Sequence, residues 1–229
     1  MTTEEFDREF DILYNNIMSN AAPSIDQYEK SVFLTKAQED VVVALYTGTF
    51  EGSEQLTESL KTLVKTVHYN SINDNHTPNS TNDKYLDLVS KNKSQLFELG
   101  DDVLFIIYES LTTNTGIEIP VRPVKHDEYL RISRNPFKRA RKNEALRVVS
   151  NQDVVGGTYR NYLEIISVYD DYIYKVRYIR KPKPIILYDK QTGLTINGVD
   201  SRTECELPDI IHRTILDVAV KLAAAAYKQ

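Results

Sequence analysis

The sequence contains one cysteine, no tryptophan and no long apolar run among its 229 residues. The single thiol, Cys205, excludes an internal disulfide and is typical of a reducing compartment. No segment approaches the roughly 18 consecutive apolar residues of a membrane-spanning helix, so we expect no contact with a membrane. Residues 1–7 are acidic and lack the basic start and apolar stretch of a secretory signal, so we expect no export by that route.

Local metal-ligand pairs and glycine-rich phosphate loops are missing as well. Zinc sites use ligands a few residues apart, and no such spacing occurs among the four histidines, which are His68, His76, His126 and His212. The glycine pair at 156–157 is not part of a Gly-Lys-Ser/Thr or GxGxxG pattern. We therefore predict no metal, no cofactor and no catalytic residue, and so no enzyme.

Two weaker patterns leave alternatives open. Cys205 precedes His212 by seven residues and lies near the expected start of the last helix, where a thiolate is favoured. A cysteine-dependent hydrolase is therefore one hypothesis. His126, Asp127 and Glu128 could supply half of a metal site, but a helix start with two acids in its first turn explains the same residues better.

What remains is the composition of an ordinary globular protein, with 41% hydrophobic and 27% charged residues. The length suits one large domain or two small ones. A formal charge of -5 argues against a surface devoted to nucleic acid but allows a local basic patch. The 15 tyrosines and 7 phenylalanines suit either half-buried sheet faces or subunit interfaces.

The first 70 residues are expected to be helical. Thr2 and Glu5 have capping-box spacing, and an apolar stripe follows at Phe6, Phe10, Leu13 and Ile17. After a linker at 24–30, Thr35 and Gln38 form a second capping box, whose helix would end at Gly48. A third helix should pair with it in antiparallel fashion through a stripe at Leu56, Leu60, Leu63, Val64 and Val67.

A polar loop and a β-rich region are expected next. Residues 70–83 are almost all Asn, Asp, Ser and Thr, which predicts an exposed loop. After Gly100, apolar segments predict strands at 103–108, 117–124, 146–149, 162–168 and 172–179, short additions at 185–188 and 194–196, and a short helix at 127–133. Pro120 and Pro123 would restrict their strand to a sheet edge. We predict an antiparallel sheet, because no crossover helix is evident.

The chain closes with a predicted helix over 208–227. Its apolar residues alternate at intervals of four and three, namely Ile211, Ile215, Val218, Leu222 and Ala225. The predicted fold class is α+β, a helical bundle of the N-terminal helices and the C-terminal helix with an inserted antiparallel β-sheet. The expected regions are 1–100, helical with the exposed polar loop 70–83; 101–204, β-rich; and 205–229, a helix that packs back on the bundle.

A basic cluster surrounds Asn135-Pro136-Phe137. It comprises Arg131, Arg134, Lys138, Arg139, Arg141, Lys142 and Arg147. One hypothesis is docking to an acidic partner through these cations, without Arg147, and Phe137. A second is a nucleic-acid-binding accessory protein that uses 131–147. A solvated loop without a role is equally consistent. Because no aromatic residue other than Phe137 accompanies the cluster, we prefer a protein partner to nucleic acid.

Four segments resemble structural proteins of crAss-like phages, in the order in which those proteins carry them. They are Phe33-Leu34-Thr35-Lys36-Ala37-Gln38; Pro120 to Arg131 with Asn135-Pro136-Phe137; Tyr178 to Leu187; and Cys205-Glu206-Leu207-Pro208 leading to His212. Each segment is moderately specific, and together they span most of the chain. The sequence is thereby similar to the neck ring proteins, the head-to-tail connectors of these phages.

The resemblance implies a structural virion protein without catalytic residues. It implies a homo-oligomeric ring of the portal's twelvefold order, located in the neck between portal and tail, with DNA passing through its channel. The implied partners are other copies of this chain, the portal protein and further neck or tail ring proteins. Assembly is expected in the host bacterial cytoplasm. Which ring of the neck this chain forms stays open.

Overall fold

A computed structural model describes residues 1–18, 23–49, 58–69, 94–149, 153–155, 158–189 and 194–227. The helices are α1 (Thr3–Met18), α2 (Gln27–Thr47), the 3-10 helix η2 (Glu58–Leu63), α4 (His126–Arg134) and α5 (Asp209–Tyr227). The strands are β1 (Val64–Tyr69), β2 (Ser94–Leu99), β3 (Val103–Thr113), β4 (Glu118–Val124), β5 (Ala145–Val149), β6 (Asp153–Val155), β7 (Thr158–Ile166) and β8 (Tyr172–Arg180). Within these ranges, no helix is long and apolar enough to cross a bilayer.

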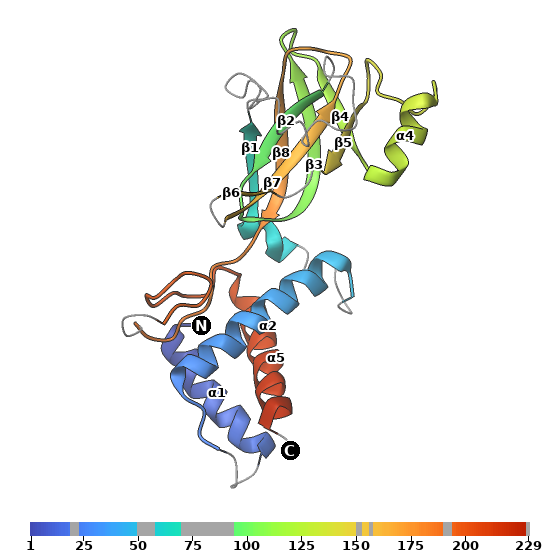
Figure 1. Cartoon of the computed structure of the whole chain (residues 1–229). Coiled ribbons are helices and arrows are strands. Elements are labelled where there is room, and N and C mark those ends of the chain that lie inside the picture. The colour runs from blue at the N-terminus through green and yellow to red at the C-terminus, as the bar shows by residue number, and fades with distance from the viewer. Residues whose placement is uncertain are drawn as a thin grey trace. The chain divides into compact units, whose positions relative to one another are not determined.

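The chain forms two compact units. Unit 1 comprises Met1–Val64 and Lys181–Gln229, and unit 2 comprises Lys65–Arg180. The helices α1, α2 and α5 belong to unit 1, and the sheet with α4 belongs to unit 2 (Figure 1). The unit boundaries therefore fall after residues 64 and 180, whereas the sequence suggested boundaries after 100 and 204. The expected loop at 70–83 lies outside the described residues.

Unit 1 is a three-helix core in which α5 contacts both α1 and α2. Phe6 and Phe10 of α1 are fully buried, and the Phe6 ring packs 5.4 Å from the ring of His212 on α5. Ile215 is buried on the same side of α5. The expected seam of α5 is confirmed at Ile211 and Ile215 only, because Val218 and Leu222 are half-buried and Ala225 is exposed. In α1, Ile17 is exposed, because Tyr14 takes the inward position instead.

An extended segment of unit 1 is bound along α2 by three polar side chains. The hydroxyl of Ser31 accepts a hydrogen bond from the backbone N–H of Leu187 (3.1 Å), and Gln38 Nε2 donates one to the carbonyl of Lys183 (2.8 Å). Thr35 between them engages both backbone groups of Ile185. Ser31, Thr35 and Gln38 lie at intervals of four and three residues, so they share one helix face. They satisfy backbone groups of Lys183, Ile185 and Leu187, while the intervening Ile186 forms an isolated antiparallel bridge with Thr203.

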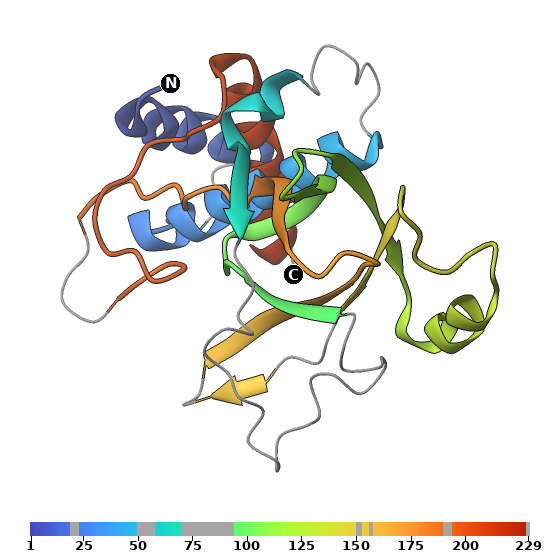
Figure 2. The same cartoon turned by 90° about the horizontal axis from the view of Figure 1, so that it is seen from above.

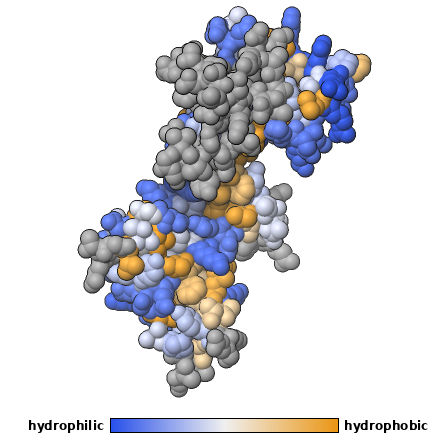
Figure 3. All heavy atoms as spheres, viewed as in Figure 1, coloured by the Kyte–Doolittle hydropathy of each residue, from blue (hydrophilic) through white to orange (hydrophobic). Residues whose placement is uncertain are grey.

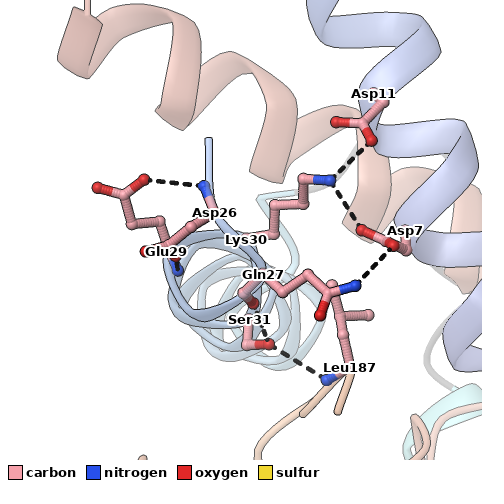
Figure 4. A network of polar contacts seen from close by, with 8 residues as sticks. All are labelled: Asp7, Asp11, Asp26, Gln27, Glu29, Lys30, Ser31 and Leu187. Carbon is pink, nitrogen blue, oxygen red and sulfur yellow. Dashed lines mark hydrogen bonds and ion pairs between the residues drawn. The ribbon is translucent and has the colours of Figure 1, made fainter. Parts of the chain in front are cut away.

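A buried lysine joins α1 to α2. The Lys30 ammonium is 5% exposed and contacts carboxylate oxygens of Asp7 (2.8 Å) and Asp11 (2.7 Å), as Figure 4 shows. Burial lowers the pKa of Lys30, but the hydrogen bonds that it donates to Asp11 and Asp7 outweigh this effect, so the pKa lies above its ordinary value. The two carboxylates therefore stabilise the charged form of the buried Lys30 side chain.

Unit 2 is built on one curled, mixed sheet. Its strands follow the order β1-β8-β3-β4-β5-β7-β2, and β6 pairs with β7 (Figures 1 and 2). β4 and β5 pair in parallel, and the other described pairings are antiparallel. β3 carries one unpaired residue between Val103 and Phe105 and another between Ile106 and Tyr108, opposite β8. Such bulges bend a strand and increase its twist, which accounts for part of the curl.

The inner face of the sheet is the core of unit 2. Large side chains fill it, among them Phe97, Leu111, Ile165, Tyr174 and Tyr178. A buried ion pair lies there too: Glu109 Oε2 on β3 is 3.1 Å from Arg147 Nε on β5 and accepts a hydrogen bond from the Tyr174 hydroxyl (2.7 Å). The N–H of Arg147 Nε does not point at a hydrogen-bond acceptor, so its contact with Glu109 is electrostatic.

The predicted fold class is wrong in two respects. The helical bundle does not dominate, because the sheet forms a unit of its own. The sheet is mixed rather than antiparallel, because α4 is the crossover between the parallel strands β4 and β5. Parallel neighbours require such a connection. The short helix at 127–133 was predicted, but its role as a crossover was not.

Individual elements also differ from the expectation. α2 begins at Gln27, where Asp26 and Glu29 form the capping box, so Thr35 and Gln38 are interior helix residues and 27–30 is not a linker. The predicted third helix is wrong over Val64–Tyr69, which is strand β1. β4 lies inside the sheet rather than at its edge. Its first half pairs only with β3 and its second half only with β5. Pro120 and Pro123 therefore each lie in a half that is hydrogen-bonded on one side only, as in an edge strand.

Candidate partner-docking site

The crossover between β4 and β5 carries the basic cluster, and we call residues 125–144 the basic arm. Its helix α4 has Asp127 and Glu128 in the first turn and Arg131 and Arg134 in the last, an order that complements the helix dipole. The predicted short helix is thus confirmed. Figures 1 and 2 show α4 projecting from the side of the sheet.

One face of α4 anchors the arm to the sheet. Tyr129 and Ile132 are buried against a small cluster formed by Val124, Leu146, Val148 and Ile166. Burial of two such side chains contributes on the order of 3–6 kcal/mol. Burial and the nearby carboxylate of Glu164 raise the pKa of the Tyr129 hydroxyl. The opposite face of α4 presents Leu130, which is 57% exposed.

The turn after α4 is held by its own hydrogen bonds. The Asn135 side chain accepts from the N–H of Phe137 (2.9 Å), and the Asn135 carbonyl accepts from the N–H of Arg139 (3.0 Å). Arg122 of β4 contacts Glu144 (2.9 Å) and donates to the carbonyl of Lys138 (2.7 Å). The backbone of the turn is therefore fixed while its cationic side chains point outward.

All seven residues predicted for docking are exposed: Arg131, Arg134, Phe137, Lys138, Arg139, Arg141 and Lys142. Phe137 is 81% exposed, the highest value among the large hydrophobic residues described. Among described residues, no hydrogen bond or ion pair engages the side chains of Arg134, Lys138, Arg139 and Lys142. In Figure 3, hydrophilic and hydrophobic atoms adjoin at the position of α4. The surface thus combines free positive charge with uncovered apolar area.

A pocket of about 590 Å³ opens beside the turn. Arg139, Arg141 and Lys142 lie at its lining together with the apolar Leu146, Ile166 and Val168. Tyr169 stays close, since its hydroxyl donates to the carbonyl of Lys142 (3.3 Å). Positive charge over an apolar lining suits an acidic segment that also carries an aliphatic side chain.

Sequence reasoning did not find the whole site. Ile166 and Val168 come from the end of β7 and the turn after it, and no local pattern connects them to the arm. Arg147 was counted with the cluster but is directed into the sheet interior, where it meets Glu109. The outward cations therefore number fewer than the sequence suggested, which weakens the case for nucleic acid.

The cysteine hypothesis finds no supporting geometry. Burial raises the pKa of the Cys205 thiol to about 11, and its sulfur lies 3.5 Å from Gln38 Oε1. Both ring nitrogens of His212 are engaged, Nδ1 by the Met1 amine (2.8 Å) and Nε2 by the carbonyl of Leu207 (2.7 Å). Burial lowers the pKa of His212. A protonated thiol and a fully engaged imidazole do not form a nucleophile and base.

Parts of three of the four resembling segments meet within unit 1, whereas the segment at 120–137 belongs to unit 2. Segment 33–38 of α2, the extended stretch 183–187 and Cys205-Glu206 are joined through Thr35, Gln38 and a hydrogen bond from the N–H of Lys183 to Glu206 (3.1 Å). No group of three or more His, Cys, Asp or Glu side chains suited to a metal occurs within the described residues. The hydrogen bonds at Thr35, Gln38 and Glu206 hold these three segments together.

Comparison with known proteins identifies the family. The family described as phage tail ring protein 3/4 matches residues 1–229. Ring protein 4/5 of Bacteroides phage crAss001 is 37% identical over 241 residues, covering 100% of this chain and 94% of the relative. Ring protein 3 of the same phage is 35% identical over 244 residues, covering 100% and 97%. The resemblance to ring proteins of crAss-like phages is confirmed, and the chain belongs to the phage tail ring protein 3/4 family of structural virion proteins.

Proposed function

We propose that this protein forms a closed ring of twelvefold order in the phage neck, between portal and tail, with DNA passing through its centre. The observation that carries the proposal is the match of the ring protein family over the whole chain, including both units. A ring around a passing duplex performs no reaction, so the proposed protein is not an enzyme. Its role in genome ejection is to keep the channel continuous.

The geometry of the basic arm supports an assembly role. A closed ring repeats one interface between two different faces of neighbouring copies. The arm offers one such face, because Phe137 and Leu130 are uncovered and its cations project from a fixed backbone. The remaining surfaces of the ring are proposed to contact the portal protein on one side and other ring proteins on the other. Assembly is proposed to occur in the host cytoplasm before the neck is complete.

Purified virions test the proposal. We expect quantitative mass spectrometry to find this chain in equal copy number with the portal protein, and averaged electron micrographs to place a twelvefold ring of its size in the neck. The proposal fails if the chain is absent from purified virions, or if its density lies outside the neck and tail. The purified protein is not the decisive sample, because ring closure can require the portal as a template.

A further inference from the structure

We propose that the basic arm of one copy docks onto the outer face of helix α1 of the neighbouring copy. The inference rests on the proposed ring and deepens it, because it names the two faces that meet at each junction. Every copy of the chain carries both faces. The faces complement each other in charge, and both carry uncovered apolar side chains.

The arm contributes positive charge and two apolar contacts. Between residues 125 and 144 the sequence carries seven basic and three acidic residues. Leu130 and Phe137 are 57% and 81% exposed. Partly apolar surfaces with central aromatic side chains and arginines are typical of protein interfaces. Because Arg122 and Asn135 fix the backbone of the turn, little conformational entropy is lost when a partner binds.

Helix α1 is the complementary face. It carries a single basic residue, Arg8, and five carboxylates, at Glu4, Glu5, Asp7, Glu9 and Asp11. Asp7 and Asp11 are shared with Lys30. Glu4 contacts Arg202 (3.5 Å) and Glu5 accepts from the N–H of Thr2, but both side chains are exposed. On the same helix Ile12 is 60% and Ile17 47% exposed. Acidic groups beside aliphatic side chains are the counterpart of the arm.

The difference in charge between the arm and α1 extends to the whole units. Unit 1 has 18 acidic and 11 basic residues in its sequence, and unit 2 has 15 acidic and 17 basic. Attraction between unit 2 of one copy and unit 1 of the next would orient the copies as they approach. Because the arm and α1 are different surfaces, each copy can offer one and accept the other. Such a head-to-tail contact closes into a ring when its rotation allows.

Nucleic acid is the less favoured ligand of the arm. Binding to DNA phosphates would explain the cations of the arm. It would not explain why Phe137 and Leu130 are exposed. The apolar lining of the pocket beside Arg139 also favours a protein partner over DNA. DNA binding is therefore an outcome that the experiment must be able to reveal.

Paired cysteines test the contact in assembled particles. In a Cys205→Ser background, Phe137→Cys is combined with Ile12→Cys, and purified virions are oxidised and run on a non-reducing denaturing gel. We expect a ladder of covalent multimers that extends toward the full ring. Each single variant should stay monomeric, because the two faces differ. Phe137→Cys with Ile210→Cys is the matched control: Ile210 is 70% exposed on α5 of the same unit, and no ladder is expected.

A second measurement avoids variants altogether. Zero-length carbodiimide cross-linking of unaltered virions should join Lys138 or Lys142 to Glu4, Glu5 or Glu9. If the ring is present but neither the ladder nor these links form, the contact is wrong while the proposed ring stands. If the chain is absent from virions, the proposed function fails as well. Binding of purified chain to duplex DNA at low salt that drops at least tenfold in Arg139→Ala/Arg141→Ala, without a ladder, would assign the arm to nucleic acid instead.

Discussion

The hydroxyl of Thr35 on α2 binds both backbone groups of Ile185, accepting from its N–H at 3.2 Å and donating to its carbonyl at 3.3 Å. Thr35 is 5% exposed and Ile185 is fully buried. The contact joins residues 150 positions apart and fixes the extended segment that follows the sheet. The Thr35 hydroxyl thus forms both backbone hydrogen bonds that a neighbouring strand would otherwise form with Ile185.

Thr35→Val tests this contact, because valine has nearly the same shape but no hydroxyl. We expect the free energy of unfolding to fall by about 2 kcal/mol or more, since a buried N–H and a buried carbonyl lose their partner. Urea unfolding followed by circular dichroism measures the change. Thr47→Val on the exposed end of the same helix is the control and should change stability by less than about 0.5 kcal/mol. Equal effects of the two variants would contradict the assignment.

The buried ammonium of Lys30 leads to the next prediction. Lys30→Met leaves Asp7 and Asp11 facing each other without a cation, so we expect a loss of about 1–2 kcal/mol, less than for a fully buried pair because Asp11 is half exposed. Because the pKa of Lys30 is raised in the folded state, its contribution to stability is complete below pH 10.5 and is lost as the pH rises above 10.5 through the raised pKa. Lys36→Met, at an exposed position of the same helix, should be close to neutral. The hypothesis is wrong if the two variants unfold at the same urea concentration.

Local sequence signals predicted the ends of several elements correctly. Thr2 and Glu5 cap α1 as expected, with the Glu5 carboxylate accepting from the N–H of Thr2 (2.8 Å). Gly48 ends α2 in the left-handed conformation with φ 69°, which favours glycine. These features depend on residues three or four positions apart. Their chemistry is therefore visible in the chain itself.

Features that depend on distant partners were not predicted. The capping-box spacing of Thr35 and Gln38 was misleading, because both side chains serve the backbone at 183–187. The cations of the arm were found from their density in sequence. The pocket beside them was not, because the end of β7 supplies part of its lining. Arg147 shows the limit most clearly, since only the register of β5 turns it inward toward Glu109.

The carboxyl of Glu109 predicts a pH dependence. Burial raises its pKa above the ordinary 4.5, although Arg147 and Tyr174 act in the opposite direction. The folded state therefore binds the proton more tightly than the unfolded state, and this group stabilises the fold most below pH 4.5. Relative to Glu109→Gln, which cannot titrate, the wild type should lose stability as the pH rises from 4.5 toward 7.

Glu118→Gln is the matched control for that experiment, because hydrogen bonds from Ser110 and Lys175 lower the pKa of Glu118. The wild type should gain stability relative to Glu118→Gln as the pH rises through the lowered pKa toward 4.5. Urea titrations of the three proteins between pH 3.5 and 7.5 measure both trends. If the wild type instead gains stability relative to Glu109→Gln as the pH rises, Arg147 outweighs burial in setting the pKa of Glu109.

The last helix provides a test of the core of unit 1. Ile215 is fully buried on α5, whereas Ile210 is 70% exposed one and a half turns earlier. Ile215→Asp places an unpaired charge among the three helices and should prevent folding or incorporation into virions. Ile210→Asp should fold and unfold like the wild type. If Ile215→Asp is incorporated normally, α5 does not pack as described.

The reactivity of the Cys205 thiol tests most sharply whether this residue takes part in catalysis. With its pKa raised to about 11 by burial, the fraction of thiolate at pH 8 is roughly a hundredth of that for a thiol with the ordinary value of 9.0. We therefore expect native protein to react with iodoacetamide at least about a hundredfold more slowly than unfolded protein, and Cys205→Ser to enter virions as efficiently as the wild type. Rapid alkylation of native protein together with loss of infectivity in Cys205→Ser would restore the hydrolase hypothesis. Rapid alkylation alone would mean only that the thiol is more accessible than its contacts with Gln38 and Leu207 suggest.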